Sequence, residues 1–247
     1  MTAIVGILCR DGVVIGTDSS ATFSAGSLRT IEQPIEKIHI CQGRIIIAGA
    51  GQVGLDQRFC ETIEKAYQEK LFLGTTDRSP MEIAKVLASK QIADFSETNA
   101  PKTEYGALVA FPHRKGAQLF EFALRDFQPE MKTHKIWYCS MGSTQTITDA
   151  FLALMREVFW IEGPPSISGG QFAAGWALEH AIKINPGGVN GPIRMAVLQN
   201  DSARLLAPGE MDEVLQSVHE ACSHLRGFRE QLKLATAPAV PMPPGKS

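Results

Sequence analysis

Short β-branched runs that alternate with tight turns fill the first fifty residues, and they limit the fold more than any other feature of the sequence. The two predicted hairpins are Ala3–Cys9 with Val13–Thr17 around Arg10-Asp11-Gly12, and Ile35–Cys41 with Arg44–Ala48 around Gln42-Gly43. Alternation of this kind is typical of antiparallel pairs. The runs Ala3–Cys9 and Ile45–Ala48 are apolar at nearly every position, which favours strands covered on both faces.

After Gly51 the hydrophobic period changes from that of a strand to that of a helix. Large apolar residues recur every fourth position, at Leu55, Phe59, Ile63 and Tyr67, and predict an amphipathic helix that ends near Leu73-Gly74. The segment Ser79-Pro80-Met81-Glu82 has an N-cap, a first-turn proline and a capping-box glutamate. A second helix is expected from there to about Ser96, burying Ile83, Val86 and Leu87.

The remaining pattern repeats this alternation of strands and helices. It predicts hairpins at 105–112 with 117–124 and 192–199 with 203–206, a strand at 135–141, and helices at 144–159, 171–184 and 210–234. The order indicates an α+β fold in which two antiparallel sheets pack face to face with helices outside. We expect one domain over residues 1–234 and a flexible, proline- and alanine-rich tail at 235–247.

Composition excludes several classes of protein. The net charge of −2 gives no overall bias toward nucleic acid or anionic membranes. No apolar run approaches the roughly 20 residues that span a bilayer, and the start of the chain lacks the basic segment and cleavage site of a signal peptide. The five scattered cysteines are typical of reduced, buried thiols. The sequence therefore predicts a cytoplasmic protein without nucleic acid or membrane partners.

Thr2 is the first candidate functional residue. Methionine is normally removed before a small residue, so we expect the mature chain to begin with Thr2, which then carries a hydroxyl and a free amine. An N-terminal amine has a reference pKa of about 7.7–8.0 and is a base that can activate the hydroxyl as a nucleophile. A hairpin centred on Asp11 places Thr2 opposite Ser20 and Asp18 opposite Ile4. The second hairpin places Lys37 opposite Ala48, next to Gly49.

The order and spacing of these motifs resemble the proteasome β-subunit family of N-terminal nucleophile (Ntn) hydrolases, closest in style to HslV-type peptidases and bacterial proteasome homologues. The motifs are Thr2, Gly12-Val13-Val14-Ile15-Gly16-Thr17-Asp18-Ser19, Lys37-Ile38 and Ile47-Ala48-Gly49-Ala50-Gly51. The resemblance covers about the first sixty residues and continues more loosely through Ser140–Ser143 and Asn185–Gly188. It implies a four-layer αββα sandwich.

The resemblance also implies a role for each matching residue. Thr2 is the nucleophile, Lys37 favours its deprotonated hydroxyl and amine, and Asp18 orients Lys37. The Gly49 amide is the oxyanion donor, and Ser143 hydrogen-bonds near the N-terminal amine. The substrate strand is lined by Ala21, Thr22, Ala50 and Gly51.

One departure from the family pattern concerns the segment before Gly187-Gly188. The family often has an aspartate and a serine there, whereas this chain has Lys183 and Pro186. The hydrogen bonds by which such residues support the site are therefore in question for this chain, and so is its rate of turnover. The nucleophile, its base, the lysine and the oxyanion donor are unaffected.

The expected function is hydrolysis of peptide bonds through an acyl-enzyme on Thr2, with no metal or organic cofactor. The resemblance further implies unfolded-protein or peptide substrates and self-association into a stacked double ring of about six or seven subunits per ring. An ATP-dependent unfoldase that feeds the chamber is a further partner that the resemblance allows.

Several alternatives remain open. The chain could be a weak or inactive ring-scaffold subunit, or hydrolyse a small amide on the same fold. Gly49-x-Gly51-x-x-Gly54 with Asp77 resembles a dinucleotide fingerprint and would suit a nucleotide-dependent oxidoreductase.

Two further motifs have simpler interpretations. His219 and His224 are five residues apart and diverge by about 140° around a helix, so a solvated face is favoured over a zinc site. His113-Arg114-Lys115 is interpreted as a hairpin tip.

Overall fold

The computed structural model describes residues 1–25, 28–72, 78–100, 104–185 and 187–231. The predicted flexible tail, 235–247, lies outside these residues. The strands are β1 Ala3–Leu8, β2 Val13–Thr17, β3 Ser20–Ala25, β4 Leu28–Pro34, β5 Ile38–Cys41, β6 Ile45–Gly51, β7 Tyr105–His113, β8 Gly116–Phe122, β9 Pro129–Met131, β10 Tyr138–Gly142, β11 Arg194–Gln199 and β12 Ser202–Leu205. The helices are α1 Val53–Gln68, α2 Pro80–Glu97, α3 Gln145–Phe159, α4 Ile167–Ile184 and α5 Pro208–Gln231.

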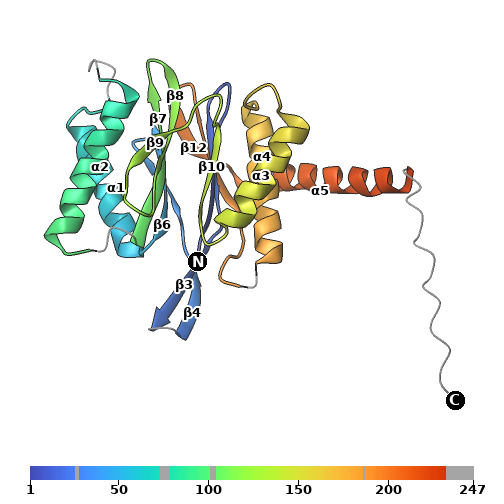
Figure 1. The fold of residues 1–247 in the computed structure, drawn as a ribbon, viewed down its shortest axis with the longest axis horizontal. Coiled ribbons are helices and arrows are strands. Elements are labelled where there is room, and N and C mark those ends of the chain that lie inside the picture. The colour runs from blue at the N-terminus through green and yellow to red at the C-terminus, as the bar shows by residue number, and fades with distance from the viewer. Residues whose placement is uncertain (26–27, 73–77, 101–103, 186, 232–247) are drawn as a thin grey trace.

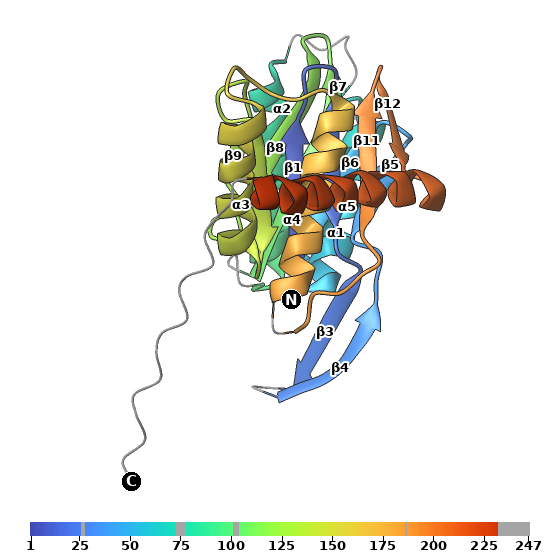
Figure 2. The ribbon, with the colours of Figure 1, turned by 90° about the vertical axis from the view of Figure 1, so that its right-hand side faces the viewer.

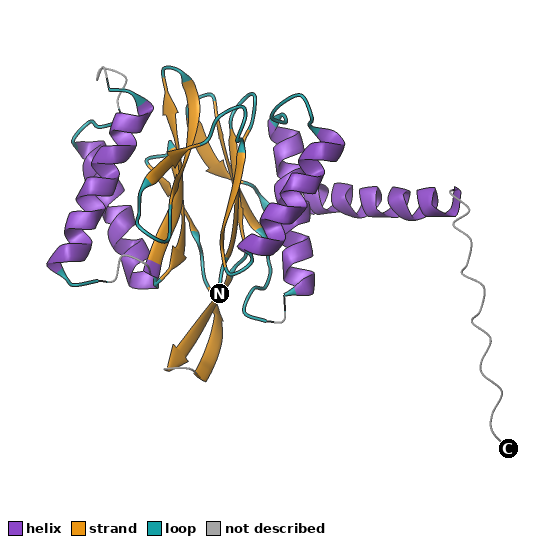
Figure 3. Cartoon of the chain, viewed as in Figure 1, coloured by secondary structure: helices purple, strands orange, loops and turns teal. Residues whose placement is uncertain are grey.

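Two antiparallel sheets face each other in the middle of the molecule (Figure 1). One has the order β10-β1-β2-β11-β12 and the other β5-β6-β7-β8-β9. Helices α1 and α2 cover the outer face of the second sheet, and α3 and α4 cover that of the first (Figure 3). The four-layer αββα sandwich predicted from the sequence is therefore confirmed.

Burial explains why the strands are apolar on both faces. Every residue of β1 and β2 is buried. Their side chains meet the opposite sheet on one face and α4 on the other, so neither face meets water. A second core, rich in aromatic rings, lies between the other sheet and helices α1 and α2, where Phe59, Phe95 and Phe127 pack edge to face.

Helix α2 begins where the sequence predicts. The Ser79 side chain accepts a hydrogen bond from the Glu82 amide, and the Glu82 carboxylate accepts one from the Ser79 amide at 2.6 Å. This reciprocal pair satisfies two of the amides that a helix start leaves unpaired. Helix α1 ends earlier than predicted, at Gln68, and α4 begins earlier, at Ile167.

The first two hairpin registers are each one residue away from the prediction. Ile4 pairs with Thr17, because the first turn contains only Arg10 and Asp11 while Cys9 donates to the Gly12 carbonyl. Ile38 pairs with Ala48, because Arg44 belongs to the second turn. A shift of one residue exchanges the faces of a strand, so these corrections affect which side chains reach the site.

Three strands were not predicted. Strands β3 and β4 form a separate two-stranded ribbon that extends beyond the sandwich near the N-terminus (Figure 1). The short strand β9 pairs with β8 at the edge of its sheet. Helix α5 lies across α4 (Figure 2), and its C-terminal part projects away from the body (Figure 1). No helix among the described residues is long and apolar enough to cross a membrane.

Candidate active site

The start of the chain lies at one end of the two sheets, beside the β3–β4 ribbon (Figure 1). Strand β1 places Thr2 next to β10 on one side and β2 on the other. Gly142, at the end of β10, has a φ of +101°, and a side chain there would collide with the Thr2 carbonyl. Glycine at this position therefore permits the close approach of the chain start to the loop that carries Ser143.

A buried carboxylate lies directly beneath the chain start. Asp18 Oδ1 accepts hydrogen bonds from the Ala3 amide at 2.9 Å and from Lys37 Nζ at 2.7 Å. Its second oxygen accepts from the Ser20 amide at 3.2 Å. Asp18 is completely buried and Lys37 is 7 % exposed, so they form an ion pair within the protein. The expected juxtaposition of Asp18 and Lys37 is present.

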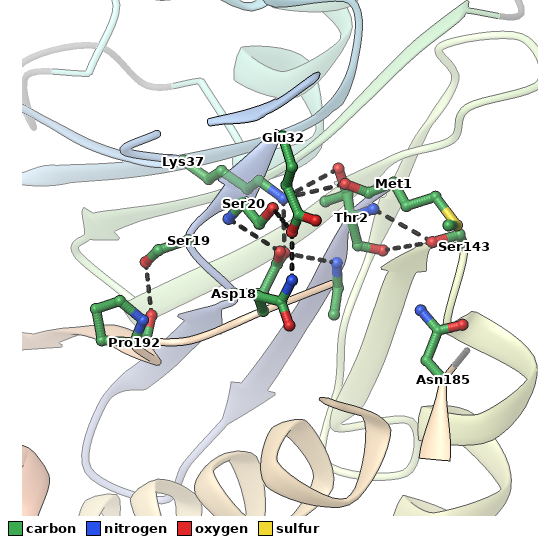
Figure 4. A network of polar contacts seen from close by, with 12 residues as sticks. Met1, Thr2, Asp18, Ser19, Ser20, Glu32, Lys37, Ser143, Asn185 and Pro192 are labelled. Atoms are coloured by element: carbon green, nitrogen blue, oxygen red, sulfur yellow. Dashed lines mark hydrogen bonds and ion pairs between the residues drawn. The ribbon is translucent and has the colours of Figure 1, made fainter. Parts of the chain in front are cut away.

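Lys37 also reaches the candidate nucleophile. Its Nζ atom lies 3.4 Å from Thr2 Oγ1 and 3.2 Å from the Met1 carbonyl oxygen (Figure 4). Burial lowers the pKa of the Lys37 ammonium from its ordinary value, and the Asp18 charge acts in the opposite direction. The hydroxyl of Thr2 therefore faces a cation that is poorly hydrated and held in place by a carboxylate.

Ser143 lies on the other side of Thr2. Its hydroxyl accepts a hydrogen bond from the Thr2 nitrogen at 3.2 Å and donates to the Thr2 carbonyl at 3.4 Å (Figure 4). In the chain with Met1 in place this nitrogen is an amide, and removal of Met1 converts it into an amine. Thr2 is thus held between Ser143 at its backbone and Lys37 at its hydroxyl.

A pocket of about 500 Å³ opens beside Thr2. Of the predicted substrate-binding residues, Ala21, Thr22 and Gly51 line it, as does Gly49. Ala50 does not line it. This residue is 1 % exposed and its side chain belongs to the core between the sheets, because side chains alternate along β6. The Ala50 side chain therefore does not line the pocket, and the expected pairing of its backbone with a substrate strand stays a prediction.

Sequence reasoning missed Asp56, which also lines the pocket. Its carboxylate accepts a hydrogen bond from the Tyr105 hydroxyl and contacts His39 Nε2, both at 2.9 Å. This contact with Asp56 raises the pKa of His39. A side chain at position 49 would collide with the Asp56 carboxylate, so glycine is required there for a packing reason as well. The regular spacing of polar residues made Asp56 look like part of a solvated helix face.

The polar surroundings of Asp18 extend into the β3–β4 ribbon. The Ser20 hydroxyl and the Asn190 amide both donate to the Glu32 carboxylate, and the Ser19 hydroxyl donates to the Pro192 carbonyl at 2.6 Å (Figure 4). These bonds connect the segment after β2 with β4 and with the loop before β11. The sequence contains no motif that indicates this network.

The sequence predicts a departure from the family pattern in the segment before Gly187-Gly188, at Lys183 and Pro186. Lys183 points to Glu179 at 3.0 Å on the same helix and is 62 % exposed. Pro186 lies outside the described residues. Asn185 donates to the Gly187 carbonyl at 3.3 Å.

The dinucleotide fingerprint lacks the structural context that it requires. Its glycines run from β6 into α1, but β6 pairs antiparallel with both β5 and β7. A fingerprint of this kind belongs to a parallel βαβ unit. Asp77, its predicted acidic partner, lies outside the described residues.

The predicted solvated face of α5 agrees with its contacts. His219 is 55 % exposed and bonds to Glu179 of α4 at 2.6 Å.

The five cysteines are free thiols; Cys9, Cys41 and Cys139 are buried, and Cys60 and Cys222 are half-buried. Burial raises the pKa of the Cys60 thiol to about 12. A thiol of this kind is a poor nucleophile.

Comparison with known proteins gives one finding. The model of the family described as "Proteasome subunit" matches residues 2–159. No curated protein matches the chain significantly. The matched segment begins at Thr2 and includes Asp18, Lys37, Gly49 and Ser143.

Proposed function

The chain belongs to the proteasome subunit family, and we propose that it is an N-terminal threonine peptidase that uses Thr2 after removal of Met1. Membership of the family supports a hydrolase in general, with peptide substrates and ring-forming self-association. The proposal for this chain depends on one observation above all. The Thr2 hydroxyl lies 3.4 Å from Lys37 Nζ, while the nitrogen that Met1 removal would free lies 3.2 Å from Ser143 Oγ.

The proposed reaction begins at the Thr2 hydroxyl. Its oxygen attacks the carbonyl carbon of the scissile peptide bond, and its proton passes to the Thr2 amine, through a water molecule. The tetrahedral intermediate collapses, the amine leaving group takes a proton from the N-terminal ammonium, and an ester on Thr2 remains. Water then hydrolyses the ester and regenerates the hydroxyl.

Lys37 and Asp18 act through charge. The Lys37 ammonium stabilises negative charge that develops on the Thr2 oxygen, and at 3.4 Å it is close enough to do so directly. Asp18 is a positioning residue, because it contacts Lys37 and the Ala3 amide and does not reach the pocket opening. Ser143 orients the Thr2 amine.

Gly49 is the proposed oxyanion donor, and the substrate binds as an added strand. Strand β7 pairs with β6 through Gly51, whereas the described pairing of β5 with β6 stops at Ala48. The edge of β6 from Gly49 to Gly51 therefore faces the pocket opposite Ala21 and Thr22. An extended peptide can pair with such an edge through its backbone.

The assembly and its location are further parts of the proposal. We infer a stacked double ring with the active sites inside, formed by a single domain over residues 1–234 that works in the cytoplasm. An ATP-dependent unfoldase is the partner that such a chamber would need for folded substrates. Substrate profiling distinguishes the hydrolysis of peptides from the hydrolysis of a small amide.

A fluorogenic peptide assay on the processed protein tests the proposal. Thr2→Ala should abolish hydrolysis and Thr2→Ser should retain part of it, since serine preserves the hydroxyl and the amine. Ser89→Ala, which removes an exposed hydroxyl from α2, serves as the control and should leave the rate unchanged. Equal rates for Thr2→Ala and the wild type would remove Thr2 from the mechanism.

A further inference from the structure

A group of three different ligand types lies at the side of the pocket that Asp56 lines. His39 comes from β5, and Asp56 and Cys60 come from α1. One nitrogen, one carboxylate oxygen and one sulfur from these residues all lie within 4.8 Å of one another. The proposed peptidase reaction uses none of the three side chains.

We propose that His39, Asp56 and Cys60 form a zinc site at the junction of β5 and α1. Imidazole, carboxylate and thiolate are the ligands that zinc takes in proteins, at about 2.0–2.3 Å from the metal. A thiolate with an imidazole disfavours magnesium and calcium, which prefer sets of oxygen ligands. Three protein ligands leave one tetrahedral position for water.

The backbone geometry suits the site. Asp56 and Cys60 are four residues apart on α1, so they project from one face of the helix. His39 pairs with Ile47 on β6, which fixes the position of its backbone. Tetrahedral coordination separates ligand atoms by about 3.3–3.8 Å. Small side-chain rotations that widen the 2.9 Å contact between His39 and Asp56 and bring Cys60 inward would give these separations.

A hydrogen bond that would orient the Asp56 ligand is already present. Tyr105 is completely buried and its hydroxyl donates to Asp56 Oδ1 at 2.9 Å. The other carboxylate oxygen, Oδ2, lies 2.9 Å from His39 Nε2. Outer hydrogen bonds of this kind orient metal ligands.

The charge of the site also favours a divalent cation. Besides Asp56, Glu36 lies near His39 and Glu64 lies near Cys60. Zinc binding replaces the thiol proton of Cys60, which passes to the buffer, and the metal with one thiolate and one carboxylate is electrically neutral. The proposal replaces the expectation from the sequence that the chain uses no metal, and it does not depend on Thr2.

Cobalt substitution tests the site directly. Untagged, chelator-treated protein is titrated with Co²⁺ in a non-chelating reductant, in both the wild type and Thr2→Ala. We expect one equivalent to give a near-ultraviolet thiolate-to-cobalt charge-transfer band together with the visible bands of a tetrahedral ion. One equivalent of Zn²⁺ should abolish these bands.

The variants identify the ligands. Cys60→Ser should lose the charge-transfer band, and His39→Gln and Asp56→Asn should lose the visible bands of tetrahedral cobalt. Cys222→Ser, at a half-buried cysteine on α5, is the matched control and should bind cobalt as the wild type does. Absence of the band in the wild type, or its persistence in Cys60→Ser, would overturn the proposal. His39 is 39 % exposed, so its variant provides the test if Cys60→Ser does not fold.

Cobalt binding and peptide hydrolysis, both measured on the wild type, separate this inference from the proposed peptidase. Cobalt binding without peptide hydrolysis by the wild type supports the metal site and rejects the proposed reaction. Hydrolysis without cobalt binding rejects the metal site and leaves the reaction in place.

Discussion

At the scale of single residues, the ion pair between Lys37 and Asp18 serves both the fold and the proposed chemistry. Asp18 is completely buried, so a carboxylate without its cation would be costly there. We predict that Lys37→Met lowers the free energy of unfolding by about 3 kcal/mol and abolishes hydrolysis. Denaturant unfolding and the peptide assay measure the two effects.

The double variant Lys37→Met/Asp18→Asn separates stability from activity. It removes both charges, so most of the lost stability should return while the protein stays inactive. Lys183→Met is the control, because Lys183 is 62 % exposed and an exposed pair contributes about 0–1 kcal/mol. A stable, active Lys37→Met protein would contradict the role given to the pair.

At the scale of elements, the edge of β6 from Gly49 to Gly51, beyond its described pairing with β5, is where the proposed substrate strand would bind. A peptide that adds to this edge should use every second backbone amide, because N–H groups on one side of a strand recur with period two. We predict that N-methylation of these amides lowers kcat/KM by about tenfold each, while the intervening positions tolerate it. A series of singly methylated peptides measures the pattern. Equal sensitivity at all positions would exclude strand addition.

The sequence predicts some of the strands and helices and misses others. Continuous apolar runs and the Ser79–Glu82 capping box indicate strands and a helix start, because burial and capping act locally. The register depends on whether a turn holds two or three residues, and turn residues alone do not decide this. Strands β3 and β4 were missed because they form a separate ribbon outside the sandwich, without the apolar pattern of its strands.

The candidate site was predicted in part. Thr2, Lys37 and Gly49 were found through family motifs, and the structure brings them to one pocket. Asp56 was missed because the pattern of α1 does not show that its polar face borders a cavity. The sequence does not show that the Ala50 side chain points into the core; neighbouring residues of a strand point in opposite directions, so Gly49 and Gly51 line the pocket and the Ala50 side chain does not.

At the scale of the whole molecule, the surface of α3 and the following loop suits contact between copies. Large apolar side chains there are about half exposed or more, namely Leu154, Val158, Phe159 and Ile161. Exposed apolar clusters of this kind are typical of protein interfaces. We predict a ring assembly at micromolar concentration, measured by size exclusion with light scattering. A clean monomer would contradict the proposed ring.

The central claim is that the mature chain has an active N-terminal nucleophile. Intact mass, recorded before and after incubation with a peptide epoxyketone, tests this most directly, because the reagent needs a hydroxyl and a free amine side by side. We predict a mass without Met1, followed by a single adduct that Thr2→Ala does not form. A chain that retains Met1 and forms no adduct would contradict the claim and favour a ring-scaffold subunit.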